Sequence, residues 1–195
     1  MPGRPRTASD AAILAATARA LGRVGPARLT LADVAVEVGL APATLVQRFG
    51  SKRRLLLALA VLGAEALAET FAAARQATDS PLDALVTALI DLTRGIDSAE
   101  ALANHLAFRQ GDLGDAEFRD QALEQSRAMR EEIRALLEEA VRAGELVRLQ
   151  SARVARAVQT TYHGSLVTWA VAREGALADW LRVDLDTMLQ PYKPL

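Results

Sequence analysis

Apolar residues recur at steps of three and four along most of the chain, which is the spacing of one buried face of an α-helix. No proline occurs between residues 82 and 190, so nothing in this stretch forces a helix to end. We therefore predict an all-α protein. The longest apolar stripes are Leu56, Leu59, Gly63, Leu67, Phe71; Leu82, Leu85, Leu89, Leu92; Phe118, Ala122, Met129, Ile133, Leu136, Ala140; and Leu177, Leu181, Leu185, Met188.

Local start and stop signals divide this pattern into separate helices. Three Ser/Thr-x-x-Asp sequences predict capped helix starts: Thr7 with Asp10, Thr30 with Asp33, and Ser80 with Asp83. Three glycines that follow periodic runs are expected to end helices: Gly22, Gly144 and Gly175. We predict nine helices, at about residues 8–22, 30–38, 42–49, 52–77, 81–94, 99–110, 115–143, 151–173 and 176–189.

Two of the short helices form a recognisable pair at residues 30–49. Val34, Ala35 and Val38 face inward on the first helix, and the small Ala35 lets a second helix cross closely. Gly39 permits a tight turn, and Leu40 and Leu45 anchor the second helix. This spacing is typical of a helix-turn-helix, whose second helix enters the major groove of DNA.

Charge is divided unevenly between the two parts of the chain. Residues 1–56 carry nine basic and three acidic side chains, a net charge of +6, whereas the remainder carries −7. Because electrostatic attraction to phosphates is local, we expect the basic N-terminal part alone to contact a polyanion; solvated helix-end arginines are the alternative. The sequence thus predicts a DNA-binding domain at residues 1–53 and an acidic helical domain at residues 54–195.

Composition further limits the classes of protein to which this chain can belong. The chain has no cysteine, which excludes disulfides, thiolate catalysis and cysteine-bound zinc. Its longest uncharged apolar stretch in the first half, residues 55–64, is shorter than the roughly 20 residues that cross a bilayer, and the first residues lack the apolar core of a secretory signal. We expect a cytoplasmic protein with no membrane partner.

Over residues 8–60 the sequence resembles the TetR family of bacterial transcriptional repressors. The matching motifs are Ala11 to Leu21, Thr30-Leu31-Ala32-Asp33-Val34-Ala35, Val38-Gly39-Leu40-Ala41, Ala43-Thr44-Leu45, and Phe49-Gly50-Ser51-Lys52 followed by Leu55-Leu56. The chain departs from the family at Ala41, where a capping serine is usual, and at Val46, where an aromatic residue is common.

The resemblance implies a ligand-responsive regulator, a repressor by family precedent, that binds a near-palindromic operator as a dimer and is released by a small-molecule effector. It implies that Thr44 and Gln47 face base edges and that Thr30 and Lys52 hold phosphates. Arg48 is our candidate replacement for the missing aromatic phosphate contact. The complete predicted DNA-binding set is Thr30, Pro42, Ala43, Thr44, Gln47, Arg48 and Lys52.

The resemblance also implies that the acidic domain binds an effector, whose identity the sequence does not specify. Polar residues within its apolar stripes are candidate ligand contacts, with a satisfied core residue as the alternative for each. The predicted ligand-binding set is Asn104, His105, Phe108, Gln125, Met129, Tyr162 and Trp169.

The last two helices, within residues 151–189, carry apolar residues on more than one face, which predicts a homodimer through a four-helix contact. One line contains Val158, Tyr162, Leu166 and Trp169, and a second contains Val154, Thr161, Gly164, Ser165 and Thr168. The small Gly164 and Ser165 are expected to let two such helices approach closely; packing within one chain is the alternative.

Two other functional classes compete with this interpretation. An enzyme is disfavoured because the two histidines, His105 and His163, lack a second ligand at helical spacing, and no phosphate loop or nucleophile motif occurs. We expect no catalytic residue, metal site or cofactor. A helical small-molecule-binding or adaptor protein that has lost specific DNA binding remains the alternative function, favoured by Ala41 and Val46.

Overall fold

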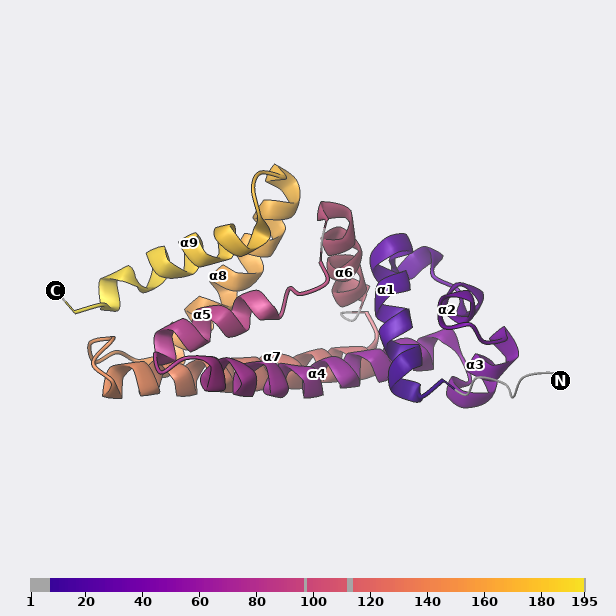
Figure 1. Cartoon of the computed structure of the whole chain (residues 1–195), viewed down its shortest axis with the longest axis horizontal. Helices are drawn as coiled ribbons and strands as arrows, with labels where there is room; N and C mark the ends of the chain where they lie inside the picture. The colour runs from indigo at the N-terminus through magenta and orange to yellow at the C-terminus, as the bar shows by residue number, and fades with distance from the viewer. Residues whose placement is uncertain (1–7, 97, 112–113, 195) are drawn as a thin grey trace. The chain divides into compact units, whose positions relative to one another are not determined.

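The computed structural model describes residues 8–96, 98–111 and 114–194. Within these residues the chain forms α-helices and one 3-10 helix, with no strand, so the predicted all-α class is confirmed (Figure 1). The elements are α1 (Asp10–Arg28), α2 (Leu31–Val38), α3 (Pro42–Phe49), α4 (Lys52–Ala77), α5 (Pro81–Asp91), α6 (Ala99–Gly111), α7 (Ala116–Arg142), α8 (Ser151–Ala172), α9 (Leu177–Leu189) and η1 (Gln190–Tyr192).

The first helix differs from its predicted end at Gly22. It continues to Arg28 through a kink at Gly25, whose φ of 75° and ψ of 162° are not helical, and Pro26 follows the kink. Gly22, which we expected to end the helix, lies within it, and the break in helical geometry occurs three residues later. Proline suits the first turn of a helical segment because its missing N–H has no intrahelical partner there.

Side-chain hydrogen bonds cap the starts of α1, α2 and α5. Thr30 and Asp33 form the predicted reciprocal capping box, and the Ser80 hydroxyl accepts a hydrogen bond from the Asp83 N–H (3.0 Å). Thr7 lies outside the described residues; α1 is capped by Ser9, whose hydroxyl accepts from the Ala12 N–H (3.1 Å). The fifth helix ends at Asp91 rather than near 94, where the chain forms consecutive turns.

The contacts divide the chain into two compact units. The first contains residues Met1–Gly63 and Glu100–Ala122, and the second contains Ala64–Ala99 and Leu123–Leu195. The first unit therefore includes α6 and the start of α7 besides the N-terminal helices. Its core is formed by Ile13, Leu14, Ala16, Ala20, Leu21, Leu29, Val34, Ala35, Leu45, Leu55, Leu56 and Phe118.

The second unit packs α5, α8 and α9 together with most of α7. Helices α8 and α9 lie against each other, and α5 contacts α9 (Figure 1). Val158, Tyr162, Leu166 and Trp169, the first line predicted to meet a partner, are buried within the chain. Ser165 is also buried, and its hydroxyl donates to Asp184 Oδ2 at 2.6 Å, so its small side chain joins α8 to α9 of the same chain rather than facing outward as we expected.

Helix α4 is long and apolar enough, by length and composition alone, to cross a membrane. It supplies buried side chains to both units: Leu55 and Leu56 to the first, Leu67 and Phe71 to the second. Several of its exposed positions are alanines, which leave little apolar area in water: Ala66, Ala68, Ala72 and Ala73. At these positions, α4 therefore buries its larger apolar side chains in the two cores and exposes alanines to solvent.

Gly25 has two separate reasons to be glycine. Its φ of +75° is strained for any side chain, and a Cβ placed there would lie 2.6 Å from Asn104 Oδ1 of α6. We predict that Gly25→Ala lowers the free energy of unfolding by about 1–3 kcal/mol, measured by urea denaturation.

Gly22→Ala is the matched control for this substitution. A Cβ at Gly22 would meet His105 Nε2 at 3.5 Å, an ordinary contact, within regular helix. It is expected to leave stability unchanged or to raise it by up to about 1 kcal/mol. Equal losses in both variants would contradict the special role of the kink.

Candidate nucleic-acid interface

The capping box fixes the start of α2. Thr30 Oγ1 accepts from the Asp33 N–H (3.2 Å) and donates to Asp33 Oδ2 (2.7 Å), which also accepts from the Thr30 N–H (2.8 Å). The Thr30 hydroxyl is the main cause that holds the pKa of Asp33 below its usual value. The hydroxyl proton predicted to hold a phosphate is therefore engaged with a carboxylate, and a phosphate would have to compete for it.

A left-handed glycine sets the turn between α2 and α3. Gly39 has φ 71° and ψ 35°, and the Leu40 N–H donates to Ala35 O (2.9 Å), which closes the end of α2. Ala35 and Leu45 have no exposed surface, so α3 is anchored against α2 through Leu45 and the rest of the core. This is the helix-turn-helix packing that the spacing predicted.

Helix α3 presents its predicted DNA-contacting residues outward. Pro42, Ala43 and Gln47 are exposed and Thr44 is half-buried. Ala41, which precedes the helix, provides no side-chain cap. The exposed Gln47 amide can pair with the hydrogen-bonding edge of adenine, and the Thr44 hydroxyl and methyl are suited to base-edge contacts.

Arg48 has partners within the protein. Its guanidinium forms an ion pair with Asp10 and donates to the carbonyl oxygen of Ala8, both at the start of α1. These contacts fasten the end of α3 to α1. A phosphate contact by Arg48, as the sequence suggested, would have to share or displace them.

Lys52 connects the first residue of α4 to the end of α1. Its ammonium donates to the carbonyl oxygens of Pro26 (2.6 Å) and Ala27 (3.4 Å). The contact satisfies carbonyls after the Gly25 kink and keeps a positive charge at the N-terminus of α4, where backbone N–H groups favour anions.

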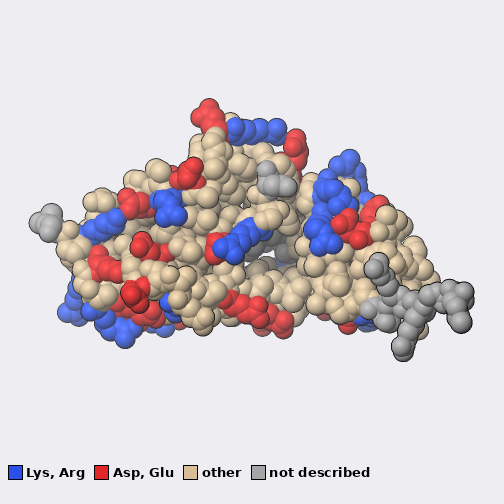
Figure 2. Space-filling view, in the orientation of Figure 1, with Lys and Arg blue, Asp and Glu red and all other residues tan. Residues whose placement is uncertain are grey.

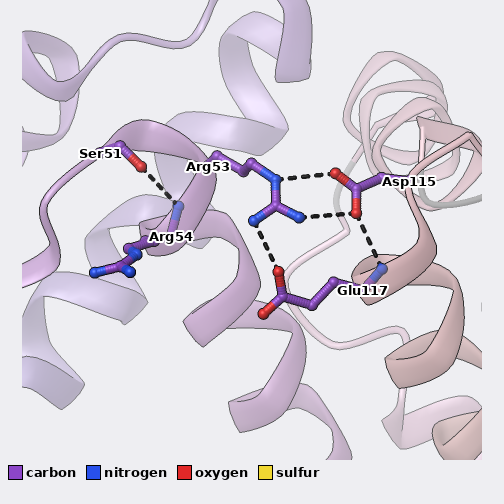
Figure 3. A network of polar contacts seen from close by, with 5 residues as sticks. All are labelled: Ser51, Arg53, Arg54, Asp115 and Glu117. Carbon is purple, nitrogen blue, oxygen red and sulfur yellow. Dashed lines mark hydrogen bonds and ion pairs between the residues drawn. The ribbon is translucent and has the colours of Figure 1, made fainter.

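Arg53 forms the most extensive ionic network in the described part of the first unit (Figure 3). Its Nε and Nη2 donate to the two carboxylate oxygens of Asp115 (2.9 and 2.8 Å), and Nη1 donates to Glu117 (2.8 Å). The guanidinium also lies 5.5 Å from the ring centroid of Phe118. The bond from Arg53 is the main cause that lowers the pKa of Asp115.

Arg54 is a candidate DNA contact that the sequence analysis did not select. It is exposed, and its guanidinium points away from the Arg53 network (Figure 3). Among the described residues its side chain has no hydrogen bond or ion pair; only its backbone N–H is bound, to Ser51 Oγ (3.2 Å). The sequence feature that could have indicated Arg54 is the run of three basic residues at 52–54. The sequence alone does not show which of these three side chains forms an ion pair.

Ion pairs reduce the positive charge available at the interface. Arg19 and Arg23 both bind Glu37, at 3.0 and 2.7 Å, so basic and acidic side chains lie side by side over the N-terminal helices (Figure 2). Those two arginines hold the pKa of Glu37 below its usual value. In the described part of the first unit, Lys52 and Arg54 remain as cations beside α3 without a carboxylate partner.

The three ligand candidates on α6 pack within the first unit. Asn104 Nδ2 donates to Gly22 O (2.7 Å), and His105 approaches Gly22. Phe108 contacts Phe118 edge-to-face, with ring centroids 6.1 Å apart. These contacts give each of the three a packing role that is independent of any ligand.

The other four ligand candidates lie in the second unit. Met129, Tyr162 and Trp169 are buried and Gln125 is half-buried; Trp169 Nε1 donates to Gly175 O (3.2 Å). Two pockets described in this unit are lined by other residues. A polar contact that the sequence analysis missed joins the buried Gln159 to Ser126 and Arg130 between α7 and α8. No group of three metal-binding side chains occurs in the described ranges.

Comparison with known proteins finds a family match over the N-terminal helices and fold likenesses over most of the chain. Residues 13–59 match the family described as bacterial regulatory proteins, tetR family. No curated protein matches the chain. The fold resembles that of a TetR transcription regulator from Haloarcula marismortui, at 19% identity and TM-score 0.79 over 95% of this chain and 98% of that chain.

Two further solved structures resemble the whole chain in the same way. A putative TetR-family regulator from Rhodococcus sp. is 24% identical, with a TM-score of 0.70 over 92% of this chain and 97% of that one. The regulator PfmR from Thermus thermophilus is 22% identical, with a TM-score of 0.68 over 91% and 97%. Residues 13–59 of this chain thus match the TetR family of bacterial regulatory proteins, and the fold of the chain resembles that of solved TetR-family regulators.

Proposed function

We propose that the protein is a ligand-responsive transcriptional repressor that binds a near-palindromic operator as a homodimer. The observation that carries this proposal is the exposed face of α3, on which Gln47 lies in solvent while Leu45 anchors the helix in the core. Arg54 provides a phosphate contact beside it, and Thr30, Arg48 and Lys52 are secondary contacts because all three have internal partners.

Dimerisation is proposed through the outward faces of α8 and α9. Val167, Val171 and Val183 have exposed fractions of 50%, 80% and 62%, and Gly164 and Thr168 are exposed between the positions that pack internally. Exposed valines beside small residues favour close helix packing with a second copy. A dimer would present two α3 helices to two half-sites.

Effector control is proposed to act on the contact between α4 and the start of α7. Arg53 stands four residues after the end of α3 and binds Asp115 and Glu117, so a movement of these two carboxylates changes the position of the first turn of α4. A ligand that favours one arrangement lowers DNA affinity by its differential affinity for the two states. Gln125, Met129, Tyr162 and Trp169 remain our proposed effector contacts.

The interface is tested by fluorescence anisotropy with the DNA upstream of the protein's own gene, a scrambled duplex and several salt concentrations. Gln47→Ala is expected to weaken binding to the upstream DNA by about tenfold and to leave the scrambled duplex unaffected. Arg54→Gln is expected to weaken both and to reduce the salt slope by about one.

Arg127→Gln controls for the loss of one positive charge, because Arg127 is exposed on α7, outside both α3 and the proposed dimer helices α8 and α9. It is expected to bind both duplexes like the unchanged protein. If the folded, unchanged protein prefers neither duplex at any salt concentration, the repressor proposal fails and the adaptor alternative is favoured.

The dimer is tested by light scattering on size-exclusion chromatography at micromolar concentration. Val167→Asp combined with Val183→Asp should convert the dimer to a monomer, because two buried unpaired charges are costly. Val147→Asp, at a position 45% exposed outside α8 and α9, should stay dimeric. A dimer that survives the double substitution would place the contact elsewhere.

The Arg53 network is tested by its pH dependence. The pKa of Asp115 is lowered in the folded state, so its contribution to stability is present above the unfolded value of about 3.9 and is lost as the pH falls. Asp115→Asn should therefore lower Tm at pH 7, with a difference that shrinks below about pH 3.9.

Asparagine keeps an acceptor for the Glu117 N–H, which Asp115 binds at 3.0 Å, so the substitution mainly removes the charge. Asp120→Asn, at an exposed position on α7, is the control and should change Tm little at either pH. A difference for Asp115→Asn that is the same at pH 7 and pH 3 would show that the ion pair does not cause it.

A further inference from the structure

The turn from α7 to α8, residues 143–150, is held in place at two points. Glu145 Oε2 accepts from the Leu82 N–H at the start of α5 (2.8 Å), and the Val147 N–H donates to Tyr192 O near the C-terminus (2.8 Å). Gly144, with φ 76°, allows the reversal. The side chains that follow in the turn therefore extend from a backbone that these two hydrogen bonds hold in place.

A pocket of about 290 Å³ opens beside this turn. Val141 and Leu149, both half-buried, form its apolar part. Its polar lining residues are Glu138, Arg142, Arg148 and Ser151. Figure 2 shows lysine and arginine side chains gathered at one end of the second unit. Figure 1 shows that α7 turns into α8 at this end.

The carboxylate in the pocket accepts hydrogen bonds from two other side chains, whereas the two arginines form no ion pair in the described ranges. Glu138 Oε1 accepts from Ser151 Oγ (2.7 Å) and from Arg134 Nη1 (2.8 Å), and these bonds lower the pKa of Glu138. Arg142 makes one bond, from Nε to the Glu138 carbonyl oxygen (3.3 Å). In the described ranges, neither Arg142 nor Arg148 has an ion pair, and the Arg148 side chain has no hydrogen bond.

A second pocket in the same unit differs from this one because its arginine has carboxylate partners. It measures about 240 Å³ and is lined by Arg75 and Glu139 among others. Arg75 is held there by Glu132 (2.7 Å) and Glu139 (3.6 Å), so that pocket offers an anion no unpaired charge. The pocket beside α8 combines two available guanidinium groups with an apolar wall in a domain that is acidic overall.

We propose that the pocket beside the α7–α8 turn binds a small organic anion. Its carboxylate or phosphate head would pair with Arg142 and Arg148, since guanidinium groups match the oxygen pairs of both anions. A short apolar tail would cover Val141 and Leu149 and leave water. The site is separate from the proposed effector contacts and does not depend on DNA binding.

The test is an NMR titration of the full-length protein with hexanoate, followed by the backbone amide signals of residues 148–151. Hexanoate should shift these signals saturably, inorganic phosphate should shift them more weakly, and the uncharged hexanamide should bind at least tenfold more weakly than hexanoate. Arg148→Gln should weaken hexanoate binding by about tenfold or more, and Arg142→Gln with Arg148→Gln should abolish it.

Arg156→Gln is the matched control, because it removes the same charge from the exposed face of α8 outside the pocket. It should bind hexanoate within twofold of the unchanged protein. Equal weakening by Arg148→Gln and Arg156→Gln would overturn the proposal in favour of nonspecific charge attraction. Hexanoate shifts confined to other residues, or hexanamide binding as tightly as hexanoate, would also overturn it.

Discussion

The complete burial of Leu45 is the constraint on which the interface depends. This side chain anchors a helix of eight residues that has no side-chain cap at its start. Such a short helix is not stable alone, so its orientation comes from the core that receives it. With Leu45 inside and Ala35 allowing close approach, the opposite face carrying Gln47 is left to solvent by geometry.

The core that receives α3 is not built by the N-terminal helices alone. Phe118 of α7 is buried in it, Asn104 of α6 binds the α1 backbone at Gly22, and Arg53 is tied to Asp115. The boundary that we expected after residue 53 describes the charge pattern, and it stays a prediction as a functional boundary. The packing unit extends to Gly63 and includes residues 100–122.

The sequence predicted the fold class and the helices closely because caps, proline positions and helical periodicity are local signals. It misplaced the end of α1, since Gly22 and Gly25 look equivalent until Asn104 is known to approach one of them. The sequence also could not separate Arg48 and Arg53, which have carboxylate partners, from Arg54, which has none among the described residues. Those partners lie 38 to 64 residues away along the chain, and sequence spacing carries no information about them.

The predicted ligand-binding residues show the same limit of prediction from sequence. An amide such as Asn104 within an apolar stripe suggests a binding site, but a backbone carbonyl on another helix satisfies it equally well.

The participation of residues 100–122 in the first unit has a practical consequence for hybrid regulators. A chimera that grafts residues 1–53 onto a foreign effector domain would lose Phe118 from its core and leave Arg53 without its carboxylates. A transferable DNA-reading module from this protein would need to bring the α6–α7 segment with it.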